Sequence, residues 1–282
     1  MKLGGSVITY KDQPKTENIE TIRRICREIK EAKQECSSRL ILGTGGGSFA
    51  HYVAHQYAIK EGLFNERTMR GNLSGKEGHP SPARSFRANA QKGFALTHDA
   101  AAEINHIVVH ECLQQDILVV SMQPSAFVVC EDGKITNLFL QPIQNLLDVG
   151  LIPVVYGDVV TDTARGCSII STEMELSALA TRLGSTRLIM CTDVDGVYET
   201  NPHTNPNAKL IPEITPSNFP SFKSVITSSH ATDVTGGMLH KVESLLALTQ
   251  FGIKSHIING MTPGLVKRAI LGEESFGTMI TQ

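Results

Sequence analysis

The sequence has almost no net charge. Its 26 lysines and arginines nearly balance its 28 aspartates and glutamates, which leaves a formal charge of −2 over 282 residues. A chain near neutrality has no global electrostatic field that would hold nucleic acid or an anionic membrane. We therefore expect neither as a partner, and any anion site must be local.

Long apolar runs and paired cysteines are also missing. No apolar stretch approaches the ~18 residues that suggest a membrane span. The first residues, Met1–Gly5, lack the charged and apolar regions of a secretory signal. The six cysteines form no C-x-x-C pair, and a chain of this length needs no covalent staples. We therefore expect reduced thiols in a cytoplasmic protein.

The two common nucleotide-binding fingerprints are absent. The chain has no G-x-x-x-x-G-K-[ST] motif, which excludes a P-loop enzyme. The stretch Gly43–Ser48 begins like G-x-G-x-x-G, but Ser48 stands at its last position, and no acidic residue ends a second strand at the right distance. A Rossmann dinucleotide site is therefore not expected.

What the chain does contain is an alternation of strand-like and helix-like segments. This alternation, with 41% apolar residues, predicts an α/β protein built on a mostly parallel sheet. A hairpin is predicted over 126–135, with Asp132 and Gly133 at its turn. Strands are predicted at 2–9 (broken by a Gly-Gly turn), 39–42, 117–121, 152–156, 187–191, 256–258 and 277–280. Helices are predicted at 18–32, 48–59, 90–115, 143–149, 173–183, 238–251 and 265–271.

One segment stands apart from this alternation. Residues Glu66–Lys92 are polar, basic and rich in glycine, proline and serine. A loop of this length inside a compact domain is usually functional or disordered. The composition leaves two alternatives open: a mobile lid over a bound acceptor, or an inert excursion.

Three glycine clusters each follow a predicted strand or open a predicted helix. They are Gly4-Gly5-Ser6, Gly45-Gly46-Gly47-Ser48 and Thr235-Gly236-Gly237-Met238. Glycines at such turns let backbone N–H groups approach an anion, and the helix N-terminus adds partial positive charge. Each cluster also has a cation or histidine beside it, namely Lys2, His51 and Lys241. The sequence therefore predicts sites for phosphate groups.

Five blocks of the chain resemble the amino-acid-kinase superfamily. They are Lys2–Thr9, Gly45–His51, Gly157–Val160, Thr192–Tyr198 and Asp233–Met238. The last two blocks, TDVDGVY and DVTGGM, are typical of the superfamily. The block GGGSFAH is typical of the branch that phosphorylates phosphates and phosphonates. Within that branch the chain is similar to the isopentenyl phosphate kinases, nearly end to end apart from residues 66–92.

The resemblance implies a fold, a reaction and an assembly. The implied fold is an α/β three-layer αβα sandwich around a mainly parallel central sheet. A boundary near Gly166 would divide it into an acceptor lobe, residues 1–165, and a nucleotide-binding lobe, residues 166–282. The implied reaction moves the γ-phosphoryl group of ATP, supplied with Mg²⁺, onto isopentenyl phosphate. The expected partners are therefore this small phosphate acceptor and, by resemblance, a second copy of the chain in a homodimer.

Three alternatives stay open at this point. The acceptor could be another phosphate or phosphonate, such as a fosfomycin-like compound or a nucleoside monophosphate. It could also be a carboxylate, although His51 argues against an acceptor that needs less positive charge. The chain could finally be a non-catalytic anion binder, against which the joint presence of Lys2, Glu173 and Lys241 argues, because binding alone needs no transfer geometry.

The resemblance also assigns roles to residues. Phosphoryl transfer depends mainly on positioning and on neutralising charge. Lys2 and Lys241 would stabilise the transferring group as catalytic residues, Glu173 would hold the two lysines apart, and His51 would hold the acceptor phosphate. The other implied acceptor-side residues are Gly46, Gly47, Phe94, Thr97, Gly157, Asp158 and Ile169. The implied nucleotide-side residues are Gly4, Gly5, Ser6, Lys11, Thr192, Asp193, Asp195, Gly196, Tyr198, Gly236 and Gly237. No protein residue is expected to hold metal directly, because Mg²⁺ arrives with ATP and keeps its waters.

The chain departs from the family pattern at four positions. Thr44 and Ala50 replace a histidine and a glycine around the triple glycine, and both changes touch the acceptor pocket. Glu173 replaces an aspartate, and His240 stands where some relatives have a lysine. These last two changes bear on rate more than on the type of reaction.

Overall fold

The computed structural model describes residues 1–63, 82–200, 202, 205, 207–228 and 237–282, with the backbone alone at 82–87, 224–228 and 237. Its centre is an eight-stranded sheet in the order β12-β14-β13-β9-β1-β2-β6-β3. All neighbouring pairs in this sheet are parallel except β13 with β14. The strands are β1 (Lys2–Leu3), β2 (Leu42–Thr44), β3 (Val119–Ser121), β6 (Ile152–Tyr156), β9 (Arg187–Thr192), β12 (Glu213–Ile214), β13 (Lys254–Asn259) and β14 (Thr278–Ile280).

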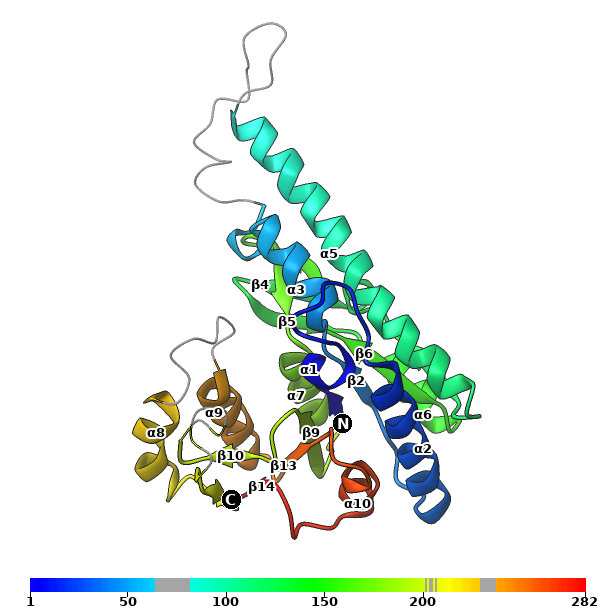
Figure 1. Cartoon of the computed structure of the whole chain (residues 1–282). Coiled ribbons are helices and arrows are strands. Elements are labelled where there is room, and N and C mark those ends of the chain that lie inside the picture. The colour runs from blue at the N-terminus through cyan, green and yellow to red at the C-terminus, as the bar shows by residue number, and fades with distance from the viewer. Residues whose placement is uncertain (64–81, 201, 203–204, 206, 229–236) are drawn as a thin grey trace, which may run out of the picture.

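Helices cover both faces of this sheet (Figure 1). The helices are α1 (Gly5–Ile8), α2 (Ile19–Glu35), α3 (Gly47–Gln56), α5 (Pro82–Leu113), α6 (Gln141–Asp148), α7 (Thr172–Arg182), α8 (Phe219–Ser228), α9 (Gly237–Thr249) and α10 (Leu265–Leu271). Two 3-10 turns, Ile59–Glu61 and Pro124–Ala126, complete the set. In the described residues, no helix is both long enough and apolar enough to cross a membrane.

Alternation along the central strands produces two separate cores. On β9, Ile189 and Cys191 face a core shared with α2, α5 and α10, whereas Leu188 and Met190 face a core shared with α7 and α9. Successive side chains of a strand point to opposite faces, so a strand buried on both sides reads as a continuous apolar run. The α/β sandwich with a mainly parallel sheet is therefore confirmed.

A smaller four-stranded sheet lies beside the main one, in the order β5-β4-β7-β8. Its strands are β4 (Val128–Glu131), β5 (Lys134–Leu138), β7 (Asp158–Asp162) and β8 (Gly166–Ile170). The predicted hairpin is confirmed: Asp132 and Gly133 both have positive φ, +48° and +78°, as a two-residue turn between twisted strands requires. A two-stranded ribbon of β10 (Val197–Tyr198) and β11 (Leu210–Ile211) lies in the second half of the chain.

Two sequence-based predictions need correction. The first strand ends at Leu3, and Gly5–Ile8 forms a short helix in which Val7 and Ile8 are buried. Strand propensity of β-branched residues is overridden there by packing. The segment predicted as a loop at 66–92 is helical from Pro82 onward, because proline suits a helix start and 83–92 are mostly good helix formers. Residues 66–81 lie outside the described residues.

The predicted boundary near Gly166 falls between β7 and β8, which pair with each other as neighbouring antiparallel strands. The main sheet runs without a break across the two predicted lobes, since β1 pairs with both β2 and β9. The division into an acceptor lobe and a nucleotide lobe stays a prediction. All six cysteines are free thiols, and five of them are buried.

Candidate active site

Two of the predicted glycine turns lie against each other at the carboxyl ends of β1 and β2. These strands pair in parallel, with Leu3 opposite Thr44, so their following turns leave the same edge of the sheet. A Cβ on Gly5 would lie 2.6 Å from Gly47 Cα, and one on Gly45 would lie 2.5 Å from Gly5 N. Only glycine permits this backbone contact, which explains the residue type at both turns.

The amides at these turns are available to a ligand. Across the described part of the chain, the N–H groups of Gly5, Ser6, Gly46 and Gly47 donate to no other group. Unsatisfied N–H groups at helix starts attract anions. The two adjoining turns therefore offer a cradle whose amides could bind anions. The roles that the resemblance implied, with Gly46 and Gly47 on the acceptor side and Gly5 and Ser6 on the nucleotide side, stay predictions.

Two lysines, Lys2 and Lys241, act electrostatically on the carboxylate of Glu173. Lys2 Nζ and Glu173 Oε1 form an ion pair, although they are 171 positions apart in the sequence. Burial would raise the pKa of Glu173, but the charges of Lys2 and Lys241 bring it below its usual range. The Glu173 carboxylate is therefore ionised beside two cations. The role of holding the two lysines apart, which the resemblance implied, stays a prediction.

A second carboxylate joins the β1–α1 turn to the end of β9. Asp193 accepts hydrogen bonds from Ser6 Oγ and from Lys11 Nζ, each at 2.9 Å. Burial would raise the pKa of Asp193, but these two donors and the Lys11 charge lower it. Lys11 is otherwise exposed, so its ammonium can exchange Asp193 for an incoming phosphate without loss of packing.

The other residues predicted to contact the nucleoside lie at the end of β9 or just after it, and hydrogen bonds tie them together. Asp195 accepts from Tyr198 Oη at 2.7 Å and from Asn259 Nδ2 at 2.8 Å. Burial and this hydrogen bond raise the pKa of Tyr198 to about 12. Thr192 is buried and donates to the Val194 carbonyl at 2.8 Å. A side chain on Gly196 would meet Thr278 Oγ1 at 2.5 Å.

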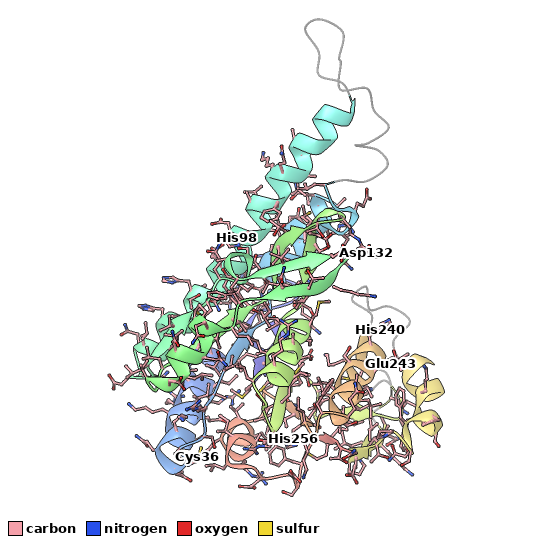
Figure 2. All side chains as sticks on the ribbon, turned by 180° about the vertical axis from the view of Figure 1, so that it is seen from behind. Cys36, His98, Asp132, His240, Glu243 and His256 are labelled. Atoms are coloured by element: carbon pink, nitrogen blue, oxygen red, sulfur yellow. The ribbon has the colours of Figure 1, made fainter. Side chains whose placement is uncertain are left out.

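The third glycine cluster is only partly visible. Gly237 opens α9, and Gly236 lies outside the described residues. Figure 2 shows His240 and Glu243 on α9, where His240 Nδ1 lies 3.5 Å from Glu243 Oε2. The histidine that replaces a lysine in this chain therefore has a carboxylate partner on its own helix.

On the acceptor side, His51 is exposed on α3, and its ring lies over the second glycine turn. A Cβ on Gly46 would lie 3.8 Å from His51 Cδ2. Gly157 was implied to be an acceptor-side residue, and its N–H donates to Thr172 Oγ1 at 2.9 Å. The Gly157 amide is therefore occupied within the protein. A Cβ on Gly157 would lie 3.2 Å from Thr172 N and Oγ1, so the lack of a side chain is the feature that this turn uses.

Asp158 differs from its predicted place in contact with the acceptor. Its carboxylate is fully buried and accepts from His98 Nδ1 at 2.9 Å, from Ser125 N at 3.1 Å and from Val159 N at 2.8 Å. Figure 2 shows His98 on α5, beside the smaller sheet. Because its oxygens are occupied, we expect Asp158 to support the site from below and not to touch the acceptor. Burial of Glu175, and to a lesser extent the charge of nearby Asp158, raise the pKa of Glu175 well above its usual value.

Phe94 and Ile169 both pack against a small apolar cluster formed by Ile59, Val159 and Cys167. Phe94 comes from α5 and Ile169 from β8. The Oγ1 of nearby Thr97 is buried and has no hydrogen-bond partner in the described residues. Ala95, by contrast, is exposed. Sequence reasoning missed the other cluster members, which no motif marks: Tyr57, Ile59, Leu63 and Cys167.

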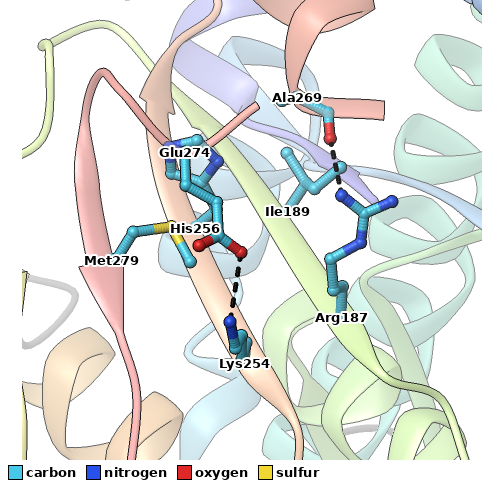
Figure 3. Close-up of a pocket in the computed structure, with 7 residues that line it drawn as sticks. All are labelled: Arg187, Ile189, Lys254, His256, Ala269, Glu274 and Met279. Carbon is cyan, nitrogen blue, oxygen red and sulfur yellow. Dashed lines mark hydrogen bonds and ion pairs between the residues drawn. The ribbon is translucent and has the colours of Figure 1, made fainter. Parts of the chain in front are cut away.

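A small hollow at the opposite edge of the sheet is a different feature. Figure 3 shows it at the starts of β9 and β13, lined by Arg187, Lys254, His256 and Glu274 among others. Arg187 donates to the Ala269 and Ile270 carbonyls, and Lys254 pairs with Glu274 at 3.3 Å. Its polar groups are therefore occupied by the protein itself. Elsewhere in the described chain, no group of three or more histidine, cysteine or acidic side chains could hold a metal ion.

Comparison with known proteins gives consistent results. The model of the amino acid kinase family matches residues 1–259. The chain is 39% identical to isopentenyl phosphate kinase of Methanothermobacter thermautotrophicus, over 100% of this chain and 98% of that protein. It is 31% identical to the enzyme of the same name from Methanocaldococcus jannaschii, over 97% and 95%. An X-ray structure of isopentenyl phosphate kinase superposes with a TM-score of 0.80 at 35% identity, covering 99% of this chain and 98% of that one.

Proposed function

The chain belongs to the amino acid kinase family, and from this membership we propose that it phosphorylates isopentenyl phosphate to isopentenyl diphosphate with ATP. It is a phosphotransferase whose acceptor is itself a phosphate. The observation that carries the proposal is the contact between two glycine turns with available amides, beside the Lys2–Glu173 ion pair. One turn can hold the donor phosphates and the other the acceptor phosphate, so that the two phosphates are adjacent.

The reaction needs charge neutralisation more than covalent help from the protein. An oxygen of the acceptor phosphate forms a bond to the γ-phosphorus of ATP, while the bond from that phosphorus to the β–γ bridging oxygen breaks and ADP leaves. Lys2 and Lys241 face the negative charge on the transferring group, one on each side. Glu173 keeps the two ammonium groups from repelling each other and fixes where they point.

The donor and acceptor phosphates take different contacts. The Gly5 and Ser6 amides and Lys11 hold the β- and γ-phosphates of ATP, so Lys11 leaves Asp193 when ATP arrives. The Gly46 and Gly47 amides and His51 hold the acceptor phosphate. Mg²⁺ bound to ATP would offset part of the charge of the β- and γ-phosphates. The complex stays anionic, which suits the ammonium groups of Lys2, Lys11 and Lys241.

The apolar cluster around Phe94 and Ile169 favours a hydrocarbon tail on the acceptor. Burying each CH₂ stabilises a complex by ~0.8 kcal/mol. The hydroxyls of a sugar would instead need polar partners, and burying them unpaired is costly. Next to this cluster, Thr97 Oγ1 is a single unpaired hydroxyl, which is too little to satisfy a sugar.

Three finer statements belong to the same proposal. ATP is delivered with Mg²⁺, the protein works in the cytoplasm and it forms a homodimer. The first rests on the chemistry above, the second on unpaired cysteines and the third on the family resemblance. Light scattering after size-exclusion chromatography checks the dimer.

The deciding experiment is a panel of acceptors incubated with ATP and Mg²⁺ and followed by ³¹P NMR. The panel contains isopentenyl phosphate, a nucleoside monophosphate, fosfomycin and N-acetylglutamate. We expect a new diphosphate doublet pair with isopentenyl phosphate alone. A phosphonate–phosphate pair, a nucleoside diphosphate or an acyl phosphate as the main product would replace the proposed acceptor. ATP consumption with every acceptor unchanged would mean that the true acceptor is missing from the panel.

A further inference from the structure

A buried threonine connects the first two glycine turns. Thr9 is 2% exposed. Its hydroxyl donates to the Gly5 carbonyl at 2.8 Å and accepts from the Ser48 N–H at 3.0 Å. Gly5 belongs to the turn after β1, and Ser48 lies in the first turn of α3, after β2. One hydroxyl therefore bonds both turns at once, and it does so where Gly47, at φ +47°, leaves room for the Thr9 side chain.

A second threonine makes the same connection one strand further along the sheet. Thr172 is also 2% exposed. Its hydroxyl donates to the Thr44 carbonyl at 2.8 Å and accepts from the Gly157 N–H at 2.9 Å. Thr44 ends β2, and Gly157 lies between β6 and β7. The Thr172 methyl group occupies the space that a side chain on Gly43 would need.

Both hydroxyls link neighbouring strand ends just beyond the last regular backbone hydrogen bonds of the sheet. The last regular bond between β1 and β2 is Gly45 N–H to the Leu3 carbonyl, at 2.9 Å. Between β2 and β6 the corresponding contact, Gly157 N–H to the Thr44 carbonyl, is stretched to 3.4 Å. At these positions glycine turns diverge from the strands, and glycine backbones have unusual freedom. The two threonines restore fixed distances there.

We propose that Thr9 and Thr172 are positioning residues that hold the three turns after β1, β2 and β6 as one rigid unit. The inference rests on the proposed function, in which the first turn holds the donor and the second holds the acceptor. The single proton of each hydroxyl is already donated to a backbone carbonyl, so neither can donate a hydrogen bond to a phosphate and neither is a catalytic residue. Their effect is to set the separation between donor and acceptor, on which in-line transfer depends.

The test replaces each threonine by valine, which keeps the shape and removes the hydroxyl. A displacement of the reacting groups by ~1 Å can lower the rate about a hundredfold, so we expect kcat to fall about ten- to a hundredfold. The KM values for ATP and for isopentenyl phosphate should change by less than about threefold, since each turn keeps its own amides. Thr9→Ser and Thr172→Ser keep the hydroxyl and should restore most of the parent kcat.

Thr249→Val is the matched control. Thr249 is 5% exposed and its hydroxyl donates to the Leu246 carbonyl at 2.8 Å, at the far end of α9. This variant should keep the parent kcat. An unchanged kcat in both Thr9→Val and Thr172→Val overturns the positioning role. A loss of kcat that tracks the loss in Tm, and that serine does not reverse, also overturns it in favour of a purely structural role.

Hydrogen–deuterium exchange separates this inference from the proposed function. The Ser48 amide in Thr9→Val and the Gly157 amide in Thr172→Val lose their acceptors, so peptides covering them should exchange faster than in the parent. Ser48 should show the larger change, because Gly157 keeps its 3.4 Å contact. Unchanged exchange in both peptides refutes the connection between the turns. A parent that leaves isopentenyl phosphate untouched refutes the proposed acceptor, while the exchange result still decides whether the threonines hold the turns.

Discussion

Replacing Lys2 by methionine tests the charge arrangement at its most buried point. Methionine keeps most of the side-chain volume and removes the ammonium group that pairs with Glu173. The Lys2 side chain is 11% exposed and the Glu173 side chain 24%, so water only partly replaces the lost charge. The substitution therefore removes a positive charge from the transferring group and leaves a poorly solvated carboxylate beside it.

Both consequences raise the free energy of the transition state more than that of the complex with bound substrates. Removing one preorganised donor from a site of developing negative charge usually costs about 2.7–4 kcal/mol, or a factor of about 10²–10³ in kcat. The unpaired Glu173 adds repulsion toward the same phosphate oxygens, so we expect a loss at the upper end of that range. ATP binds through other groups as well, namely the amides after β1 and Lys11, so its dissociation constant should rise less than about tenfold.

The kcat value is measured from the rate of ADP release at saturating ATP and isopentenyl phosphate. The dissociation constant for ATP is measured by calorimetry without acceptor. Lys30→Met is the matched control, because Lys30 forms an exposed pair with Asp116 at 3.2 Å, away from the site. It should leave both quantities unchanged. If Lys2→Met weakens ATP binding more than about a hundredfold and leaves kcat intact at saturating ATP, Lys2 anchors the nucleotide and the transition-state argument is wrong.

Three further predictions follow from other parts of the structure. His51→Ala should lower kcat/KM for isopentenyl phosphate about ten- to a hundredfold, since a charge-assisted hydrogen bond is worth roughly 1.5–3 kcal/mol; unchanged kinetics would remove His51 from the site. Phe94→Ala should raise kcat/KM for geranyl phosphate relative to isopentenyl phosphate by about tenfold, because two more buried CH₂ groups supply that much; a constant ratio refutes the tail assignment. Asp162→Ala should lower stability by about 3 kcal/mol in urea unfolding, because its buried carboxylate accepts bonds from Gly133, Arg165 and others across both hairpin turns. Burial would raise the pKa of Asp162, but these bonds hold it well below 3.8. The contribution of Asp162 to the free energy of unfolding is therefore complete above pH ~4 and is lost as the pH falls further. If parent and variant differ in unfolding free energy by the same amount at pH 7 and pH 2, this reasoning is wrong.

The sequence by itself determined the features that depend on local chemistry. Gly5, Gly46 and Gly47 are required wherever the backbone must approach another backbone or a ligand, and the turn at Asp132–Gly133 needs positive φ at two successive residues. The segments 152–156 and 187–191 were predicted as strands, and both are strands of the central sheet. Each of these conclusions follows from residue type and spacing over fewer than ten positions, which is why reading along the chain sufficed.

Only the tertiary structure decided which distant groups meet. The resemblance implied that Glu173 lies beside Lys2, but the pair spans 171 positions, and no local pattern shows that α7 starts beside β1. Asp158 follows the predicted phosphate-site glycine, yet His98 on another element and two backbone amides occupy its carboxylate. Thr9 closes the Lys2–Thr9 block and Thr172 precedes Glu173, but no pattern in the sequence gave either threonine a role. A hydroxyl becomes a connector between turns only when the sheet brings a donor and an acceptor to either side of it. Contacts of this kind are set by strand order and packing, and those are properties of the whole chain.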